Sequence, residues 1–143
     1  MHKSFYASGF LYHAASRQIL LQQNTSVPPA SSNWSLFEVV SEQEEPEISF
    51  KKIISDLLNI KIAKFHTVYS YFNEHKDQDQ YIGYSTVKAR QQFSPKNGIT
   101  FAWFSFKDVL KLQTSAQMKH DIVVGQRVIE AATRKRLGEH TFQ

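Results

Sequence analysis

Apolar and polar residues alternate with a helical period in residues 50–60, FKKIISDLLNI. The apolar positions follow the spacing of a half-buried helix and are Phe50, Ile53, Ile54, Leu57 and Leu58. Proline is tolerated at the first helical position, so we predict that the helix begins at Pro46. Asparagine adopts the left-handed conformation readily, which makes Asn59 the predicted C-cap. The pattern therefore predicts a helix over about residues 46–58.

Most of the remaining chain has the shorter apolar runs that are typical of β-strands. The predicted strands cover residues 4–13, 18–23, 34–40, 60–72, 80–89 and 99–106, and a loop rich in proline and serine fills residues 24–33. One helical turn is predicted at residues 107–112. A second helix is predicted at about residues 117–136, with Gly125 as a weak point. This order, without an internal repeat, predicts a single mixed α+β domain over residues 1–143.

The composition is that of a folded domain without cysteine chemistry. Of the 143 residues, 41% are hydrophobic and 13% are aromatic, which suffices for a core and argues against disorder. Because there is no cysteine, disulfides, thiolate metal sites and cysteine nucleophiles are excluded. No run approaches the ~18 apolar residues of a membrane span, and the first residues lack a signal-peptide core. We therefore expect a soluble cytoplasmic protein without a membrane partner.

The net charge of +4 is mild, and its clearest cluster is Arg134, Lys135 and Arg136 in the segment TRKRL. Cations stabilise the C-terminal end of a helix because they oppose its dipole, and we interpret the cluster in this way. The alternative is contact with phosphate or nucleic acid. No base-reading motif accompanies the cluster, so we do not expect nucleic acid as a partner.

Four glutamates lie around the start of the first predicted helix, in the segment SEQEEPE at residues 41–47. The order of elements, with this acidic loop, resembles the Nudix hydrolase superfamily, whose signature reads G-x5-E-x7-R-E-U-x-E-E-x-G-U with U a bulky aliphatic residue. Laid without a gap on residues 38–60, the signature is met by Glu44, Ile54 and Ile60. The substituted positions are Glu38 and Asn59 at the two glycines, Lys52 at the arginine, and Ile53, Asp56 and Leu57 at the last three glutamates. The resemblance spans about Phe5 to Leu137 and implies a Nudix-like α/β/α sandwich with a mixed central sheet.

The resemblance implies that the chemistry of this degenerate box has been lost. In Nudix hydrolases the helix presents carboxylates that hold Mg²⁺ or Mn²⁺ against a pyrophosphate, and Ile53 and Leu57 cannot ligate a cation. Asp56 and Glu44 remain as the candidate metal ligands and catalytic residues of an active enzyme. No Asp or Glu between Gln80 and Lys107 compensates for the loss. We expect no cofactor, or Mg²⁺ or Mn²⁺ if the chain is an active pyrophosphohydrolase.

Two further sets of residues are candidate ligand contacts. Lys52 is expected to pair with Glu44 and brace the loop, Glu38 to crowd the metal site, and Trp34 to stand in the core or at the cleft edge. These three, Lys52, Glu38 and Trp34, are the predicted ligand-binding residues. Aromatic residues also recur in the strands, at Tyr69, Tyr71, Phe72, Tyr81 and Tyr84. We interpret them as cross-strand packing rather than as base-stacking platforms.

Three functions follow, and the first is the leading hypothesis. The chain is expected to be a catalytically weak or inactive Nudix-fold protein that binds a nucleotide-like molecule or regulates a partner. The first alternative is a divergent Mg²⁺- or Mn²⁺-dependent hydrolase of a nucleoside diphosphate linked to another group. The second is a protein-interaction domain or homodimer that uses the apolar face of the box helix. We expect the cleft to have collapsed or partly closed over Ile53 and Leu57, since the hydrophobic effect favours burying both side chains over leaving them exposed to water.

Overall fold

The computed structural model describes residues 4–25, 33–41 and 44–141, and the side chains of this set as far as residue 137. Most of the predicted loop at 24–33, and Glu42 of the acidic segment, lie outside this part of the chain. The elements are β1 (Phe5–His13), β2 (Gln18–Asn24), β3 (Trp34–Ser35), β4 (Phe37–Ser41), α1 (Pro46–Leu58), β5 (His66–Asn73), β6 (Gln78–Thr86), β7 (Ile99–Ser105), α2 (Phe106–Val109) and α3 (Ala116–Thr141).

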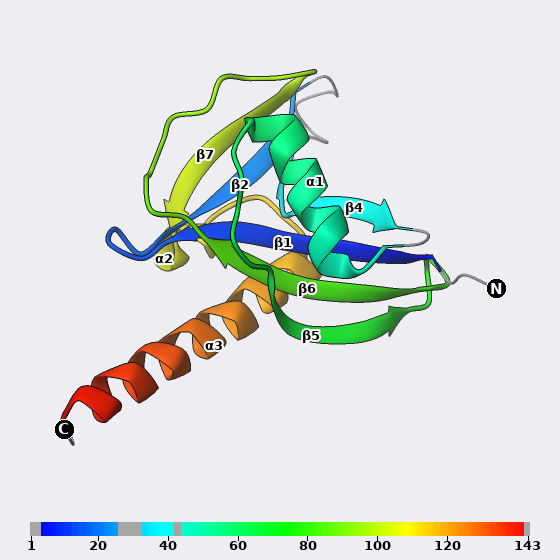
Figure 1. Cartoon of the computed structure of the whole chain (residues 1–143). Coiled ribbons are helices and arrows are strands. Elements are labelled where there is room, and N and C mark those ends of the chain that lie inside the picture. The colour runs from blue at the N-terminus through cyan, green and yellow to red at the C-terminus, as the bar shows by residue number, and fades with distance from the viewer. Residues whose placement is uncertain (1–3, 26–32, 42–43, 142–143) are drawn as a thin grey trace.

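Strand β1 is the centre of a mixed sheet (Figure 1). It pairs in parallel with β6 along one edge, while its other edge pairs antiparallel with β4 over its first half and with β2 at its end. Strand β5 extends the sheet beyond β6, and β7 extends it beyond β2. Gly9 and Gly83 face each other in the parallel pair, where a Cβ atom on Gly9 would lie 2.4 Å from the carbonyl oxygen of Gly83. The close approach of β1 and β6 therefore requires glycine.

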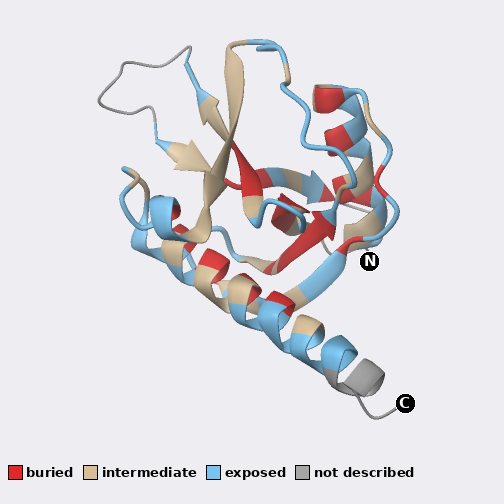
Figure 2. Ribbon diagram, turned by 90° about the vertical axis from the view of Figure 1, so that its left-hand side faces the viewer, coloured by how far each residue is buried: buried red, intermediate tan, exposed pale blue. Residues whose placement is uncertain are grey.

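Helices cover both faces of the sheet, because alternate side chains of a strand point to opposite faces. On one face Leu11, Leu20 and Phe37 pack against Phe50, Ile54 and Leu58 of α1. On the other face Phe10, Tyr12 and Ile19 pack against Met118, Ile122 and Ile129 of α3. Figure 2 shows the buried residues in the central strands and on the inner sides of both helices. The predicted α/β/α sandwich is confirmed.

The predicted box helix is confirmed at both ends. Helix α1 starts with Pro46 in its first turn and ends at Asn59, whose φ of 56° and ψ of 40° are left-handed. The predictions for two strands are corrected. The strand expected at 34–40 is split at Leu36, since β3 pairs with β2 whereas β4 pairs with β1. The strand expected at 60–72 begins only at His66, because Ile62 and Phe65 turn inward onto the core below α1.

The second helix is longer than predicted, and Gly125 has a packing role in it. Helix α3 runs to Thr141, and its C-terminal part extends past the edge of the sheet (Figures 1 and 2). Gly125 is buried against Phe10, and a Cβ atom there would lie 3.0 Å from two atoms of that ring. Glycine therefore allows α3 to approach the sheet closely at this point.

Candidate functional site

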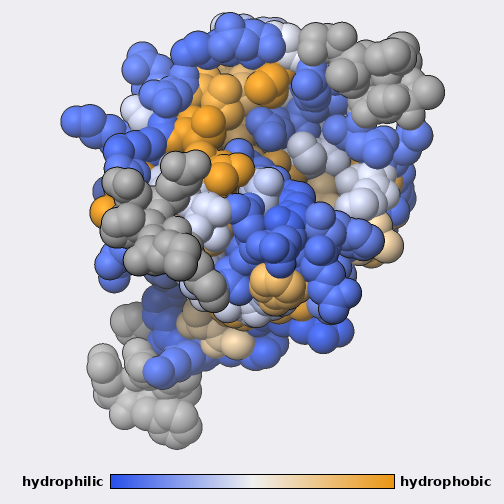
Figure 3. All heavy atoms as spheres, turned by 90° about the vertical axis from the view of Figure 1, so that its right-hand side faces the viewer, coloured by the Kyte–Doolittle hydropathy of each residue, from blue (hydrophilic) through white to orange (hydrophobic). Residues whose placement is uncertain are grey.

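A cleft of about 470 Å³ lies between α1 and β4, and we call it the box cleft. Its helical wall is Ser49, Lys52, Ile53 and Asp56, which share one side of α1 because they follow an i, i+3, i+4, i+7 spacing. Val39 and Val40 of β4 form the opposite wall. Figure 3 looks onto the β4 side of the molecule and shows hydrophobic side chains gathered in its upper part, rimmed by hydrophilic ones.

The two aliphatic substitutions of the box have different surroundings. Ile53 is half-buried and lines the box cleft, so its outer surface faces an open hollow. Leu57 is half-buried as well, and both side chains pack against the core under α1, but Leu57 does not line the cleft. The expected closure therefore applies to Leu57, whereas the cleft stays open over Ile53.

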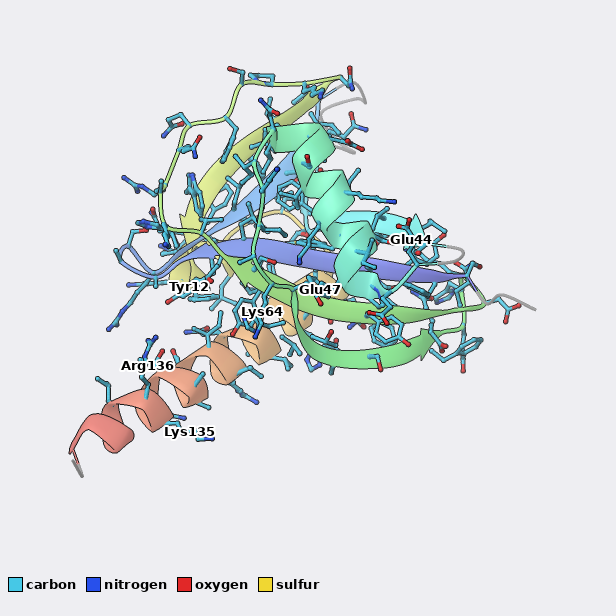
Figure 4. All side chains as sticks on the ribbon, viewed as in Figure 1. Tyr12, Glu44, Glu47, Lys64, Lys135 and Arg136 are labelled. Carbon is cyan, nitrogen blue, oxygen red and sulfur yellow. The ribbon has the colours of Figure 1, made fainter. Side chains whose placement is uncertain are left out.

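An ion pair closes the acidic end of the box cleft. Lys52 Nζ donates to the Glu44 carboxylate, as the resemblance implied. Ser41 fixes the loop before it, since its hydroxyl donates to the Glu44 carbonyl oxygen at 2.9 Å. Glu47 lies on the other side of α1, towards Lys64 (Figure 4), and its partner is Lys51 at 3.1 Å. The hydrogen bond and charge of Lys51 lower the pKa of Glu47. Glu47 is thus a surface partner of the helix and no part of the cleft.

The side-chain oxygens of the box cleft do not suit a hard divalent cation. Mg²⁺ takes six oxygen ligands in near-octahedral geometry, which include one or two carboxylates together with waters and phosphates. Of the carboxylates in the cleft, Asp56 is exposed and Glu44 is neutralised by Lys52. Among the residues that the structure describes, no three His, Asp or Glu side chains come together as a metal-binding group. Among the described residues, the cleft thus offers a cation one carboxylate that is not in an ion pair, that of Asp56, and this donor set is a poor fit to Mg²⁺ or Mn²⁺.

A second pocket, of about 330 Å³, lies on the opposite face of β4, between the sheet and the start of α3. Glu38 belongs to this acceptor pocket and not to the box cleft, which corrects the expectation that it crowds the metal site. The reason is strand alternation, since Phe37 faces α1 and the next side chain must face α3. The Glu38 carboxylate accepts hydrogen bonds from Ser8 Oγ at 2.9 Å, from Gln80 Nε2 at 3.3 Å and from Lys76 Nζ at 2.7 Å.

Asp121 of α3 is the other carboxylate of the acceptor pocket, and it is buried. It accepts hydrogen bonds from the Tyr69 hydroxyl and from Gln117 Nε2, the latter at 2.9 Å. Burial raises the pKa of Asp121, and these hydrogen bonds together with His120 oppose the rise. Burial and the hydrogen bond to Asp121 also raise the pKa of the Tyr69 hydroxyl. The pocket therefore holds a desolvated acceptor oriented by its neighbours.

Aromatic rings complete the acceptor pocket. Trp34 lines it and packs edge-on against Phe104, with ring centroids 4.8 Å apart. Tyr71 also lines the pocket and stacks on Tyr69, with centroids 5.7 Å apart. Burial and the charge of Asp121 raise the pKa of Tyr71. Tyr69 and Tyr71 thus pack along one face of β5, and Tyr71 also faces a pocket.

The structure divides the predicted site residues between the two hollows. Glu44, Lys52 and Asp56 meet in the box cleft, while Glu38 and Trp34 meet in the acceptor pocket. The sequence analysis missed the acceptor pocket as a unit. The residues that line it come from β1, β3, β4, β5, β6 and α3, so no local sequence motif predicts this pocket. In the described part of the chain, no helix has an apolar stretch long enough to cross a membrane.

Comparison with solved structures places the chain among proteins of one fold. A hydrolase of the NUDIX family from Clostridium perfringens matches with a TM-score of 0.66 and 11% identity, over 92% of this chain and 99% of that one. A C. elegans Ap4A hydrolase, solved as a binary complex, matches with a TM-score of 0.68 and 15% identity over 88% and 98% of the two chains. The C-terminal domain of mouse MUTYH, solved in complex with human PCNA, matches with a TM-score of 0.67 and 10% identity over 90% of each. No protein-family model and no curated protein sequence matches the chain.

Proposed function

We propose that this chain, which has the Nudix fold, binds a nucleotide-like ligand as a binding or regulatory module and has little or no pyrophosphohydrolase activity. The ring of the ligand lies in the acceptor pocket on one face of β4, and its phosphates pass around the edge of β4 that does not pair with β1, toward the box cleft on the other face. The proposal rests on the fold together with the chemistry of the two hollows, which differ in what they can hold.

The observation that carries the proposal is the lining of the box cleft by Ile53. A side chain without oxygen stands there beside a carboxylate, Glu44, that is already bound by Lys52. Pyrophosphate cleavage on this scaffold depends on a cation that neutralises phosphate charge and activates water. Without a fitting donor set this step has no support. The Lys52 side chain is 64% exposed, and its ammonium group has three donors, so it can donate to a phosphate oxygen while it stays paired with Glu44.

The acceptor pocket supports the ring of the ligand. Glu38 and Asp121 supply carboxylate oxygens, and Trp34 and Tyr71 supply aromatic walls. Hydrogen-bonding groups between aromatic walls suit a flat, polar ring with N–H donors, as a nucleobase is. Both hydrogen bonds to Asp121 fall on Oδ1, so an amino group of the ring can donate to Oδ2.

The test is calorimetric titration of the protein with nucleoside mono-, di- and triphosphates in the presence of EDTA. We expect binding that is weakened by Trp34→Ala and Asp121→Asn and is retained without a divalent cation. Robust Mg²⁺-dependent release of phosphate or of a nucleoside monophosphate, abolished by Asp56→Ala, would overturn the proposal. No heat of binding with any of these nucleotides would count against it equally.

A divergent hydrolase is the second candidate, and the exposure of Asp56 in the open box cleft favours it. It predicts a manganese site that includes Asp56 and Glu44. Titration with MnCl₂ separates the two candidates, because the leading proposal expects no binding tighter than millimolar.

A homodimer through the apolar face of α1 and β4 is the third candidate. Val40 favours it, since 49% of this aliphatic residue is exposed beside Ile53. Light scattering of the wild-type chain against Val40→Glu tests this interface. A monomer in both samples excludes it.

A further inference from the structure

A third hollow, of about 930 Å³ against 470 Å³ for the box cleft, lies at the far end of the fold from both pockets. We call it the α3 groove. One wall is the outer half of α3, from Gln126 to Leu137, and the other wall is the end of the sheet around Tyr12, Arg17 and Tyr84. No predicted site residue lies in it, and the proposed nucleotide site does not use it.

The groove exists because α3 continues after it has left the sheet. The buried positions of the helix end at Ile129, and residues from Glu130 to Leu137 are exposed except for half-buried Thr133. The face that packs on the core is prolonged by Ala132, Thr133 and Arg136, which line the groove instead of a core. Figure 1 shows this part of α3 running past the strands. Because this part of α3 extends beyond the strands, the side of the helix that continues its core-facing side is not covered by the sheet.

Arginines dominate the charge of the groove. Arg17 stands on the sheet wall, and Arg134 and Arg136 stand on the helical wall. Within the described residues, none of the three takes part in an ion pair. Among the described residues of the lining, Glu130 is the carboxylate, and it accepts a hydrogen bond from Gln126 at 3.0 Å. The groove therefore presents an excess of guanidinium groups, which favour carboxylate or phosphate partners.

The interpretation of the basic cluster as a helix terminus is wrong for this fold. Helix α3 continues to Thr141, so Arg134 and Arg136 lie before its last turn. The dipole effect decays within the last turn, and it does not explain their position. Their shared lining of the groove with Arg17 of a distant turn points to an external anion instead.

The floor of the groove is apolar and its rings are not open for base stacking. Tyr12 and Tyr84 are 8% and 7% exposed, and Tyr84 is covered by His66, with ring centroids 5.1 Å apart. Single-stranded nucleic acids are held by exposed aromatic faces along a basic track. This groove offers buried rings and aliphatic side chains such as Ile129, which suit the apolar side chain of a peptide.

We propose that the α3 groove docks an acidic segment of a partner protein in extended conformation, with one bulky apolar side chain on the floor and carboxylates facing Arg17, Arg134 and Arg136. Gln126 and Leu137 are eleven residues apart on the helix, which corresponds to about 17 Å at the α-helical rise and to about five residues of an extended chain. The length of the groove thus suits the binding of a short linear motif rather than of a folded surface.

The test uses fluorescence anisotropy of the full chain with the labelled peptide GEELEEG, and GKKLKKG as the charge-inverted probe. Arg136→Glu and Lys135→Glu form a matched pair, since they are adjacent and change the net charge equally. Lys135 does not line the groove, and Figure 4 shows it on the opposite side of α3 from Arg136. Both residues are exposed, so neither change threatens the fold.

We expect GEELEEG to bind and GKKLKKG not to bind. Arg136→Glu should weaken GEELEEG by about tenfold and Lys135→Glu by less than about twofold, since a surface charge pair contributes roughly 1 kcal/mol and reversal adds repulsion. Equal losses in the two variants would overturn the proposal, because they would indicate a general field effect. Binding of a single-stranded oligonucleotide that competes at the groove, or self-association abolished by Arg136→Glu, would assign the groove to another occupant and overturn it as well.

Discussion

Replacing Ile53 by glutamate tests whether the box cleft is open, which is the premise of the proposed function. Ile53 and its neighbour Ile54 make a matched comparison. Ile53 lines the cleft and is half-buried, whereas Ile54 is 0% exposed on the core-facing side of α1. The same substitution therefore places a carboxylate in a solvated hollow at one position and in the core at the next.

The two expected free-energy changes differ several-fold. Full burial of an isoleucine is worth about 1.5–3 kcal/mol, so losing a half-buried one costs about 1 kcal/mol. Truncating a fully buried isoleucine costs about 2–5 kcal/mol, and burying a carboxylate adds several more. Because a domain of this kind is stable by about 5–15 kcal/mol, Ile54→Glu is expected to unfold it or nearly so, and Ile53→Glu is not.

Urea denaturation at pH 7, followed by tryptophan fluorescence, measures both changes. A loss of about 1 kcal/mol for Ile53→Glu, with an unchanged slope against urea, supports an open cleft. If Ile53→Glu destabilises the chain as severely as Ile54→Glu, the cleft has closed over Ile53. The proposed phosphate end of the ligand then has no place to lie.

Three further predictions concern metal binding, the sheet and pH. Ile53→Glu is expected to create manganese binding tighter than millimolar, measured by calorimetry, since it adds a carboxylate beside Asp56 in the cleft; unchanged heats would show that the loss lies elsewhere. Gly9→Ala is expected to destabilise the fold by about 2–3 kcal/mol in urea, because the added Cβ would lie 2.4 Å from the Gly83 carbonyl oxygen; a wild-type midpoint would contradict the close approach. Burial raises the folded-state pKa of Asp121, so its contribution to stability is present below its usual pKa of 3.8 and is lost as the pH rises through the raised value. Asp121→Asn should therefore flatten the fall in stability above pH 4, and identical pH profiles for variant and wild type would refute this.

Local patterns in the sequence were sufficient for the elements whose reasons are local. The apolar stripe of residues 50–58, the proline at its start and the asparagine after it place α1 at Pro46–Leu58. The ion pair of Glu44 with Lys52 also followed from the box pattern. Likewise, the apolar side chains at positions 53 and 57 were evident from the sequence.

Tertiary structure decided what depends on which elements become neighbours. Leu36 splits a strand because its two halves pair with different partners, and Glu38 faces Asp121 because strand alternation and the placement of α3 act together. The different surroundings of Ile53 and Leu57 depend on how α1 is set against β4 and the core. The α3 groove joins Arg17 to Arg136, which are far apart in the chain. Side chains from distant segments meet through packing of the whole sheet. The periodic pattern of one segment predicts which of its side chains are buried, but not which other segment they pack against.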